Sequence, residues 1–249
     1  PKITMQLGPT CGFYAFANAI VQTQKIPKKI VHQIVQKSIQ QLRPKTGAET
    51  KKEHETFTYV GEVFSNSQTK AMIERVSHNI LLNPTIQEHK VEMFEQLLSS
   101  LNEGEIILLP IQLIQKVKKK KIQNVHWISI YKRNKKIYYI NPNYLRTHKL
   151  SNKKLKAFIV QSTKVKSTYF NWNDWFNSMV NRKNDQYRYK LSLTKRLILP
   201  LSYSTFFDDL FNQPYTKSFF QSINQNTQVT FKDLHLFKIS FSNQENSVQ

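Results

Sequence analysis

Cysteine is almost absent from this chain, which has one, Cys11, among its 249 residues. A single cysteine excludes an intramolecular disulfide and any zinc site built from several thiolates. We therefore expect no disulfide-stapled secreted scaffold, no metal site and no bound cofactor. The one thiol is available either as a nucleophile or as a small buried apolar side chain.

Acidic residues are also scarce. Asp and Glu total 16 against 37 Lys and Arg, which gives a formal net charge of +21 at pH 7. Such a charge attracts nucleic acid, an anionic membrane or an acidic protein, and it equally fits a solvated lysine-rich surface. The densest basic run, residues 116–121, comes with no zinc-finger spacing, aromatic RNA-binding signature or recognition helix. Nucleic acid is thus a partner that the sequence permits but does not specify.

Long apolar runs are missing as well. No segment approaches the ~20 consecutive apolar residues of a membrane span. The beginning of the sequence lacks the charged and apolar regions of a secretory signal. We expect a protein without a transmembrane segment that resides in the cytoplasm, with delivery outside the cell by another route left open.

Helical spacing of apolar residues dominates the first hundred residues. It follows Cys11, continues over residues 27–42, weakens over residues 59–76 and returns over residues 91–101. These segments predict helices, and the second should pack on the helix that follows Cys11.

The pattern changes at Glu105. Residues 106–111 form a continuous apolar run, which is typical of a buried strand. Residues 125–131 and 136–140 are rich in β-formers and are joined by a polar segment that suits a hairpin turn. We therefore expect an α+β fold in which N-terminal helices pack on an antiparallel sheet.

Two parts are expected along the chain. Residues 1–165 would form a core with a helical insertion, and residues 166–249 a C-terminal extension packed on that core. Within the extension, residues 172–180 have an apolar helical face, and residues 187–199 resemble one long or two short strands.

Cys11 lies where a glycine-proline turn enters a helical pattern. Gly8 and Pro9 are costly inside a helix, so Cys11 should fall in the first turn. The unpaired N–H groups and the positive end of the dipole at a helix N-terminus lower the pKa of a thiol, and a nearby imidazolium lowers it further. This position predicts a reactive cysteine, although a buried structural cysteine fits the local pattern too.

A thiol nucleophile needs a base, and the base needs an orienting partner. His126 opens one predicted strand and Asn141 ends the next, so a tight hairpin would place the Asn141 amide beside the imidazole. A histidine satisfied within a strand, followed by a simple turn at Asn141, is the alternative. The other six histidines lie in helical or polar contexts without an evident orienting partner: His32, His54, His78, His89, His148 and His235.

Gln6 is the fourth candidate residue of the site, after Cys11, His126 and Asn141. It precedes Cys11 by five residues, and its side-chain N–H together with the Cys11 backbone N–H would give two donors to an oxyanion. Four stretches of the sequence resemble the motifs of papain-like cysteine peptidases: Gln6, the segment 8–12 (GPTCG), His126 with Trp127, and the segment 140–142 (INP).

Within that superfamily, the short spacing of His126 and Asn141 is most similar to the bacterial branch that includes the double-glycine leader peptidases of bacteriocin exporters. The resemblance covers residues 1–145 and implies that Cys11 is the nucleophile, His126 the base and acid, Asn141 the orienting residue and Gln6 the oxyanion donor. The chain departs from that branch because Asn141 stands where the leader peptidases usually carry aspartate. It also has no attached transporter segment.

The expected function is that of a thiol-dependent hydrolase that cleaves an amide bond in a protein or peptide through an acyl-thioester. An acidic substrate is favoured if residues 116–121 lie at the mouth of the site, whereas the same run is without effect on catalysis if it forms only a solvated turn. A transglutaminase, deamidase or acyltransferase would use the same chemistry. A basic adaptor that binds nucleic acid or an acidic protein without catalysis is the remaining alternative.

Overall fold

The helix that carries the single cysteine begins at Cys11 itself. In the computed structural model of the chain, α1 spans Cys11–Thr23, so Cys11 lies in the first turn as its sequence context predicts. Thr10 occupies the N-cap position, and its side chain makes no capping hydrogen bond. The structure describes residues 1–6, 10–44, 57–58, 61–117, 120–173, 218, 221, 228–231 and 233–242.

Three further helical regions form where the apolar spacing predicts them. The first and the last of these three regions begin with a 3-10 turn that leads into an α-helix. In the middle one, the Ser65 side chain accepts a hydrogen bond from the Gln68 N–H and caps the helix. The regions are η1 Lys28–Ile30 with α2 Val31–Gln41, α4 Asn66–His78, and η2 Val91–Met93 with α5 Phe94–Ser99.

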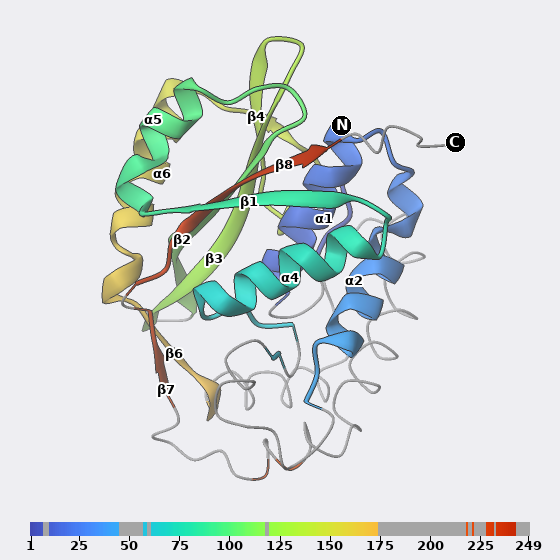
Figure 1. The fold of residues 1–249 in the computed structure, drawn as a ribbon. Helices are drawn as coiled ribbons and strands as arrows, with labels where there is room; N and C mark the ends of the chain where they lie inside the picture. Colours follow the sequence, from blue (N-terminus) through green and yellow to red (C-terminus); the bar gives the residue numbers. More distant parts are fainter. Residues whose placement is uncertain are drawn as a thin grey trace, which may run out of the picture.

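An antiparallel sheet forms the centre of the described part of the chain and packs with helices, which confirms the α+β class (Figure 1). Its strand order is β1-β8-β2-β3-β4-β5, so β3 and β4 lie side by side as the predicted hairpin. The strands are β1 Asn83–His89, β2 Ile106–Val117, β3 Lys120–Arg133, β4 Lys136–Ile140, β5 His148–Lys149 and β8 Leu236–Ser242. A separate pair joins β6 Tyr169–Asn171 to β7 Gln228–Thr230.

Both faces of the sheet are covered, which explains the continuous apolar run in β2. Ile106 and Leu108 pack in one buried cluster with α1, α2 and α4. Ile107 and Leu109 point to the opposite face and join a second cluster with α5 and with α6, Asn152–Thr163. Successive strand residues alternate between faces, so a strand buried on both sides needs apolar residues throughout.

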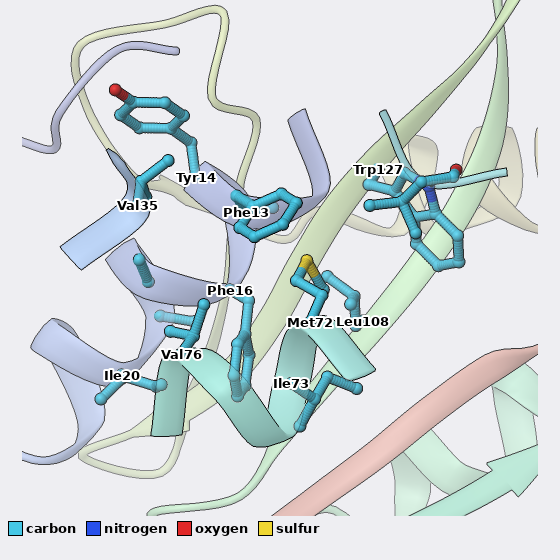
Figure 2. Close-up of a cluster of buried hydrophobic side chains, with 14 of the residues drawn as sticks. Phe13, Tyr14, Phe16, Ile20, Val35, Met72, Ile73, Val76, Leu108 and Trp127 are labelled. Atoms are coloured by element: carbon cyan, nitrogen blue, oxygen red, sulfur yellow. The ribbon is translucent and has the colours of Figure 1, made fainter. Parts of the chain in front are cut away.

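Helix α1 packs closely across β3 (Figure 2). A Cβ on Gly12 would lie 3.2 Å from Val63 Cγ2 and 3.5 Å from Trp127 Cδ1, so glycine after the cysteine permits this approach. The Ser129 hydroxyl donates a hydrogen bond of 2.7 Å to the Ala15 carbonyl. The apolar side of α1 meets α4 through the side chains of Phe13, Phe16, Ile20, Met72, Ile73 and Val76.

The N-terminal segment ties α1 to the chain that follows β4. The Ile3 N–H donates to the Leu145 carbonyl at 2.8 Å, and the Gln6 N–H donates to the Pro142 carbonyl at 2.9 Å. The buried Asn18 side chain accepts from the Thr4 N–H and donates to the Thr4 carbonyl, both at 2.8 Å. These bonds fix Gln6 beside the segment that contains Asn141.

The C-terminal part of the chain contributes to the central sheet. Strand β8 lies between β1 and β2, so residues on both sides of the expected boundary at 165/166 share one sheet. The division into a core and an extension stays a prediction. The expected helix over residues 172–180 is described only to Asn173, and the expected strands over residues 187–199 lie outside the described residues. Among the described helices, none combines the length and the apolar character needed to span a bilayer.

Candidate active site

The β3–β4 hairpin places Asn141 beside His126, as the spacing predicts. Pairing ends at Ser129 opposite Ile140, and Asn141 follows Ile140 directly. Continuing this register sets Asn141 diagonally across from His126, within reach of its side chain. The His126 Nε2 and the Asn141 Oδ1 lie 2.8 Å apart and share a hydrogen bond.

A second contact decides which way the Asn141 amide faces. Its Oδ1 also accepts a hydrogen bond of 3.0 Å from the Asn143 N–H, the Asx turn that asparagine commonly forms two residues ahead. Because the oxygen accepts both bonds, Nε2 of the neutral imidazole must carry the hydrogen. Nδ1 is then left as a lone-pair acceptor, which is the form that a general base requires.

The Cys11 sulfur lies at the backbone of the same strand. The Trp127 N–H donates a hydrogen bond of 3.4 Å to Sγ. Trp127 lies opposite Pro110 of β2, and the pairing of β3 with β4 does not extend as far as Trp127. Bond lengths then place Sγ within about 6 Å of the His126 Cα.

The thiol and the imidazole come together only indirectly in this structure. Among the hydrogen bonds of the described residues, none joins Sγ to the His126 ring itself. In sites of this kind the contact between nucleophile and base often tightens only when substrate binds. The structure thus brings His126 and Asn141 into direct contact and holds Cys11 beside the strand that carries His126.

The expectation of a lowered thiol pKa is wrong for this arrangement. Burial raises the pKa of the Cys11 thiol to about 11, although the N–H groups of Trp127, Gly12 and Cys11 itself oppose the shift. The residue is half-buried, and the protein packed around it removes enough water from the thiol to account for the direction of the shift. The backbone N–H groups at the helix N-terminus lower the thiol pKa as predicted, but the loss of hydration on burial raises it by more.

Burial also shifts the pKa of the His126 imidazole. Burial lowers the pKa of His126 to about 4, and the hydrogen bond to Asn141 offsets only part of this. At neutral pH both Cys11 and His126 are therefore uncharged. A reaction here requires the imidazole to take the thiol proton as the sulfur attacks, not a preformed ion pair.

This shift predicts a loss of stability in acid. The unfolded chain binds a proton on His126 near the ordinary pKa of 6.5, whereas the folded chain does so only near 4. The free energy of unfolding should therefore fall by about 3 kcal/mol as the pH drops from 6.5 to 4, with no further change from this group below that. Urea unfolding of the wild type and of His126→Gln at pH 7 and pH 4 measures the difference. An equal loss in both proteins contradicts the assignment.

Gln6 lies beside the turn that follows Asn141. Its backbone bond to Pro142 holds it there, and its side chain is half-buried. Two participants were not predicted from sequence: the Trp127 N–H at the sulfur and the Asn143 N–H at Asn141. The Asn-Pro-Asn sequence was the available signal for the second, because asparagine before proline favours a turn.

The remaining described histidines have other settings. His32 Nδ1 shares a hydrogen bond of 2.7 Å with the Tyr14 hydroxyl, and His235 Nδ1 lies 2.6 Å from Glu88 Oε1. The His148 ring stacks on Tyr139. His54 lies outside the described residues, and within the described ones no group of three or more His, Cys, Asp or Glu is placed to hold a metal ion.

Comparison of the chain with protein-family models and with curated protein sequences finds no match. The geometry of Cys11, His126 and Asn141 is therefore what bears on function.

Proposed function

We propose that the chain is a papain-like, thiol-dependent hydrolase that cleaves an amide bond in a protein or peptide. The observation that supports this most strongly is the hydrogen bond between His126 and Asn141, next to a thiol at the start of α1. The imidazole and its orienting amide come from one hairpin, and the thiol at the start of α1 accepts a hydrogen bond from the backbone of the residue next to His126. These three groups are the minimal set for nucleophilic catalysis by cysteine.

The steps follow from the tautomer at His126. Nδ1 accepts the proton of the Cys11 thiol while Sγ attacks the substrate carbonyl carbon, and a tetrahedral oxyanion forms. The C–N bond then breaks, and the imidazolium returns the proton to the leaving amine. Water, deprotonated by the same imidazole, attacks the thioester and releases the carboxylic acid and the free thiol.

The oxyanion needs donors aimed at the position where its charge develops. The Cys11 N–H belongs to the first turn of α1, where no carbonyl of the same helix can accept it. The Gln6 side chain is the proposed second donor, because its backbone is fixed at Pro142, next to Asn141.

The acyl-thioester can also be passed to an amine or formed from a glutamine side chain. No contact of the described residues favours such an acceptor over water, so hydrolysis is the function proposed. The cytoplasmic location expected from the sequence stays a prediction.

The test uses p-nitrophenyl acetate, an activated ester that acylates thiols. We expect intact-mass analysis to find one acetyl group on Cys11, and p-nitrophenol release to continue through several turnovers. Cys11→Ala should carry no acetyl group. His126→Ala should turn over about 100-fold more slowly, because it lacks the general base.

The matched control is His78→Ala, which removes an exposed histidine at the end of α4. It should retain wild-type turnover. Equal turnover in the wild type and in His126→Ala would sink the proposal. Mass spectrometry of a peptide library treated with the active chain then separates cleavage from deamidation or crosslinking.

A further inference from the structure

The strand register shows which face of the sheet carries His126. Ile128 and Ile130, the next alternate residues of β3, lie in the buried cluster that one face of the sheet forms with α5 and α6. Tyr139 of β4 belongs to the same cluster. Because alternate strand residues point to the same face, His126 and Asn141 belong to this face as well. Tyr139 and Asn141 are two strand residues apart, a distance of about 7 Å, so the surroundings of Tyr139 adjoin the candidate site.

Aromatic rings connect Tyr139 to the surface. The His148 ring stacks on Tyr139 with a centroid distance of 5.4 Å, and the Tyr144 ring meets His148 edge-on at 5.7 Å. At the buried end, Phe158 of α6 meets Tyr139 edge-on at 5.1 Å. His148 is exposed, and Tyr144 is 53% exposed. These four residues, called the aromatic cluster below, therefore offer two rings to a partner.

The exposed end of the aromatic cluster is attached to the candidate site by a turn. The Tyr144 N–H donates a hydrogen bond of 3.0 Å to the Asn141 carbonyl. A turn of this size keeps its first and last Cα atoms within about 7 Å of each other. The bond from the Asn143 N–H to the Asn141 Oδ1 lies within the same turn. The turn that orients the amide toward His126 thus also presents the Tyr144 ring to solvent.

Positive charge accompanies these rings. Residues 106–173 contain 16 Lys and Arg and not a single Asp or Glu. The Lys154 ammonium lies 5.2 Å from the centre of the Phe158 ring, and Arg146, two residues after Tyr144, is exposed. Among the ion pairs of the described residues, none includes Arg146 or Lys154. Cations of this kind beside exposed rings favour a partner that is both aromatic and acidic.

We propose that the aromatic cluster, together with Arg146 and Lys154, docks a segment of the protein substrate in which an aromatic side chain stands next to Asp or Glu. The proposal rests on the proposed function and names the substrate class of that site. The substrate ring packs on Tyr144 and His148 as an offset or edge-on pair, and the neighbouring carboxylate meets the cations. An extended peptide advances about 3.3–3.6 Å per residue, so such a segment lies only a few residues from the bond at Cys11.

Single-stranded nucleic acid also stacks its bases on aromatic rings beside cations. A peptide is favoured because the aromatic cluster adjoins a thiol that attacks acyl carbons, which nucleic acid does not offer. The two ligands are compared directly in the test.

The test measures binding separately from chemistry, on the full chain carrying Cys11→Ala, with fluorescence anisotropy as the readout. Three fluorescein-labelled octapeptides alternate Glu with Tyr, Glu with Ala, or Gln with Tyr, and a labelled twelve-residue oligothymidylate is the fourth ligand. We expect the Glu-Tyr peptide to bind about tenfold more tightly than either of the other peptides. Equal affinity for the Glu-Tyr and Glu-Ala peptides, or no binding of any peptide, overturns the proposal.

The contribution of the rings is tested by Tyr144→Ala. Its matched control is Tyr169→Ala in β6, because both tyrosines are 53% exposed. We expect Tyr144→Ala to raise the dissociation constant of the Glu-Tyr peptide about tenfold and to leave that of the Glu-Ala peptide unchanged, whereas Tyr169→Ala changes neither. An unchanged Glu-Tyr affinity in Tyr144→Ala, or equal weakening by both substitutions, contradicts docking at the aromatic cluster.

The contribution of charge is tested by combining Arg146→Gln with Lys154→Gln. The control combines Lys29→Gln with Lys37→Gln, two exposed lysines of η1 and α2. The first pair should weaken binding of the Glu-Tyr peptide about tenfold and the control pair only slightly. Equal weakening in both overturns the proposal, because it shows attraction by net charge alone.

Tighter binding of oligothymidylate than of any peptide, lost in Tyr144→Ala, overturns the proposal in favour of nucleic acid. Acylation of Cys11 by p-nitrophenyl acetate is measured separately on the wild type. Failure of docking at the aromatic cluster and failure of the thiol chemistry are therefore distinguishable.

Discussion

Alkylation of Cys11 by iodoacetamide should be slow at pH 7 and accelerate about a thousandfold by pH 10. The thiolate is the reactive form, and with a thiol pKa of about 11 its fraction rises tenfold per pH unit across this range. The rate should level off only above pH 11. Intact-mass time courses at half-unit pH intervals give the profile directly, since Cys11 is the sole thiol.

The unfolded chain is the internal control. In concentrated urea the thiol regains its ordinary pKa of 9.0, so labelling at pH 7 should become about 100-fold faster than in the folded protein. Rapid labelling of the folded protein that is constant between pH 6 and 8 contradicts this prediction. That result would mean that Cys11 and His126 form an ion pair at rest.

A slow thiol at rest is compatible with catalysis at this site. A neutral imidazole with Nδ1 unprotonated can remove the proton during attack, so a stable thiolate is not needed. The same burial that raises the thiol pKa strengthens the hydrogen bonds offered to the oxyanion, because the local dielectric is low. Activation then depends on the substrate carbonyl being held next to Sγ.

Local patterns were sufficient to predict the parts that carry this site. The Gly-Pro turn predicted the start of α1, and the hairpin spacing predicted the contact between His126 and Asn141. Both depend on short-range rules, namely helix-breaking residues and strand register. The sign of the Cys11 pKa shift was not predictable in this way, because it depends on how many groups from distant segments enclose the sulfur.

Local sequence patterns also do not predict β1, or the place of β8 in the sheet. β1 alternates exposed and half-buried positions and contains Pro84, so it has little of the apolar character of a buried strand. β8 is apolar, but its place between β1 and β2 is a long-range pairing that local periodicity does not encode. The two strands pair with each other from Asn83 opposite Ser242 to His89 opposite Leu236.

Replacing Asn141 by alanine should lower kcat/KM for a cleaved peptide by about a thousandfold, while aspartate at the same position should retain activity within about tenfold. Alanine removes the oxygen that accepts from both His126 Nε2 and the Asn143 N–H, so the imidazole loses its fixed tautomer. Aspartate keeps that oxygen and adds a negative charge. The charge stabilises the imidazolium and raises the pKa of His126 from about 4.

The pH profile separates this role from a merely structural one. For Asn141→Asp the acid limb of kcat/KM should move to higher pH than in the wild type, whereas a loss of folding would lower activity at every pH. Nitrogen-15 spectra of the imidazole should show the hydrogen on Nε2 in the wild type and a mixture of tautomers in Asn141→Ala. Asn152→Ala, at the exposed start of α6, is the matched control and should change neither readout. Wild-type activity and an unchanged tautomer in Asn141→Ala would show that the amide does not orient His126, and that another group holds the imidazole in its reactive form.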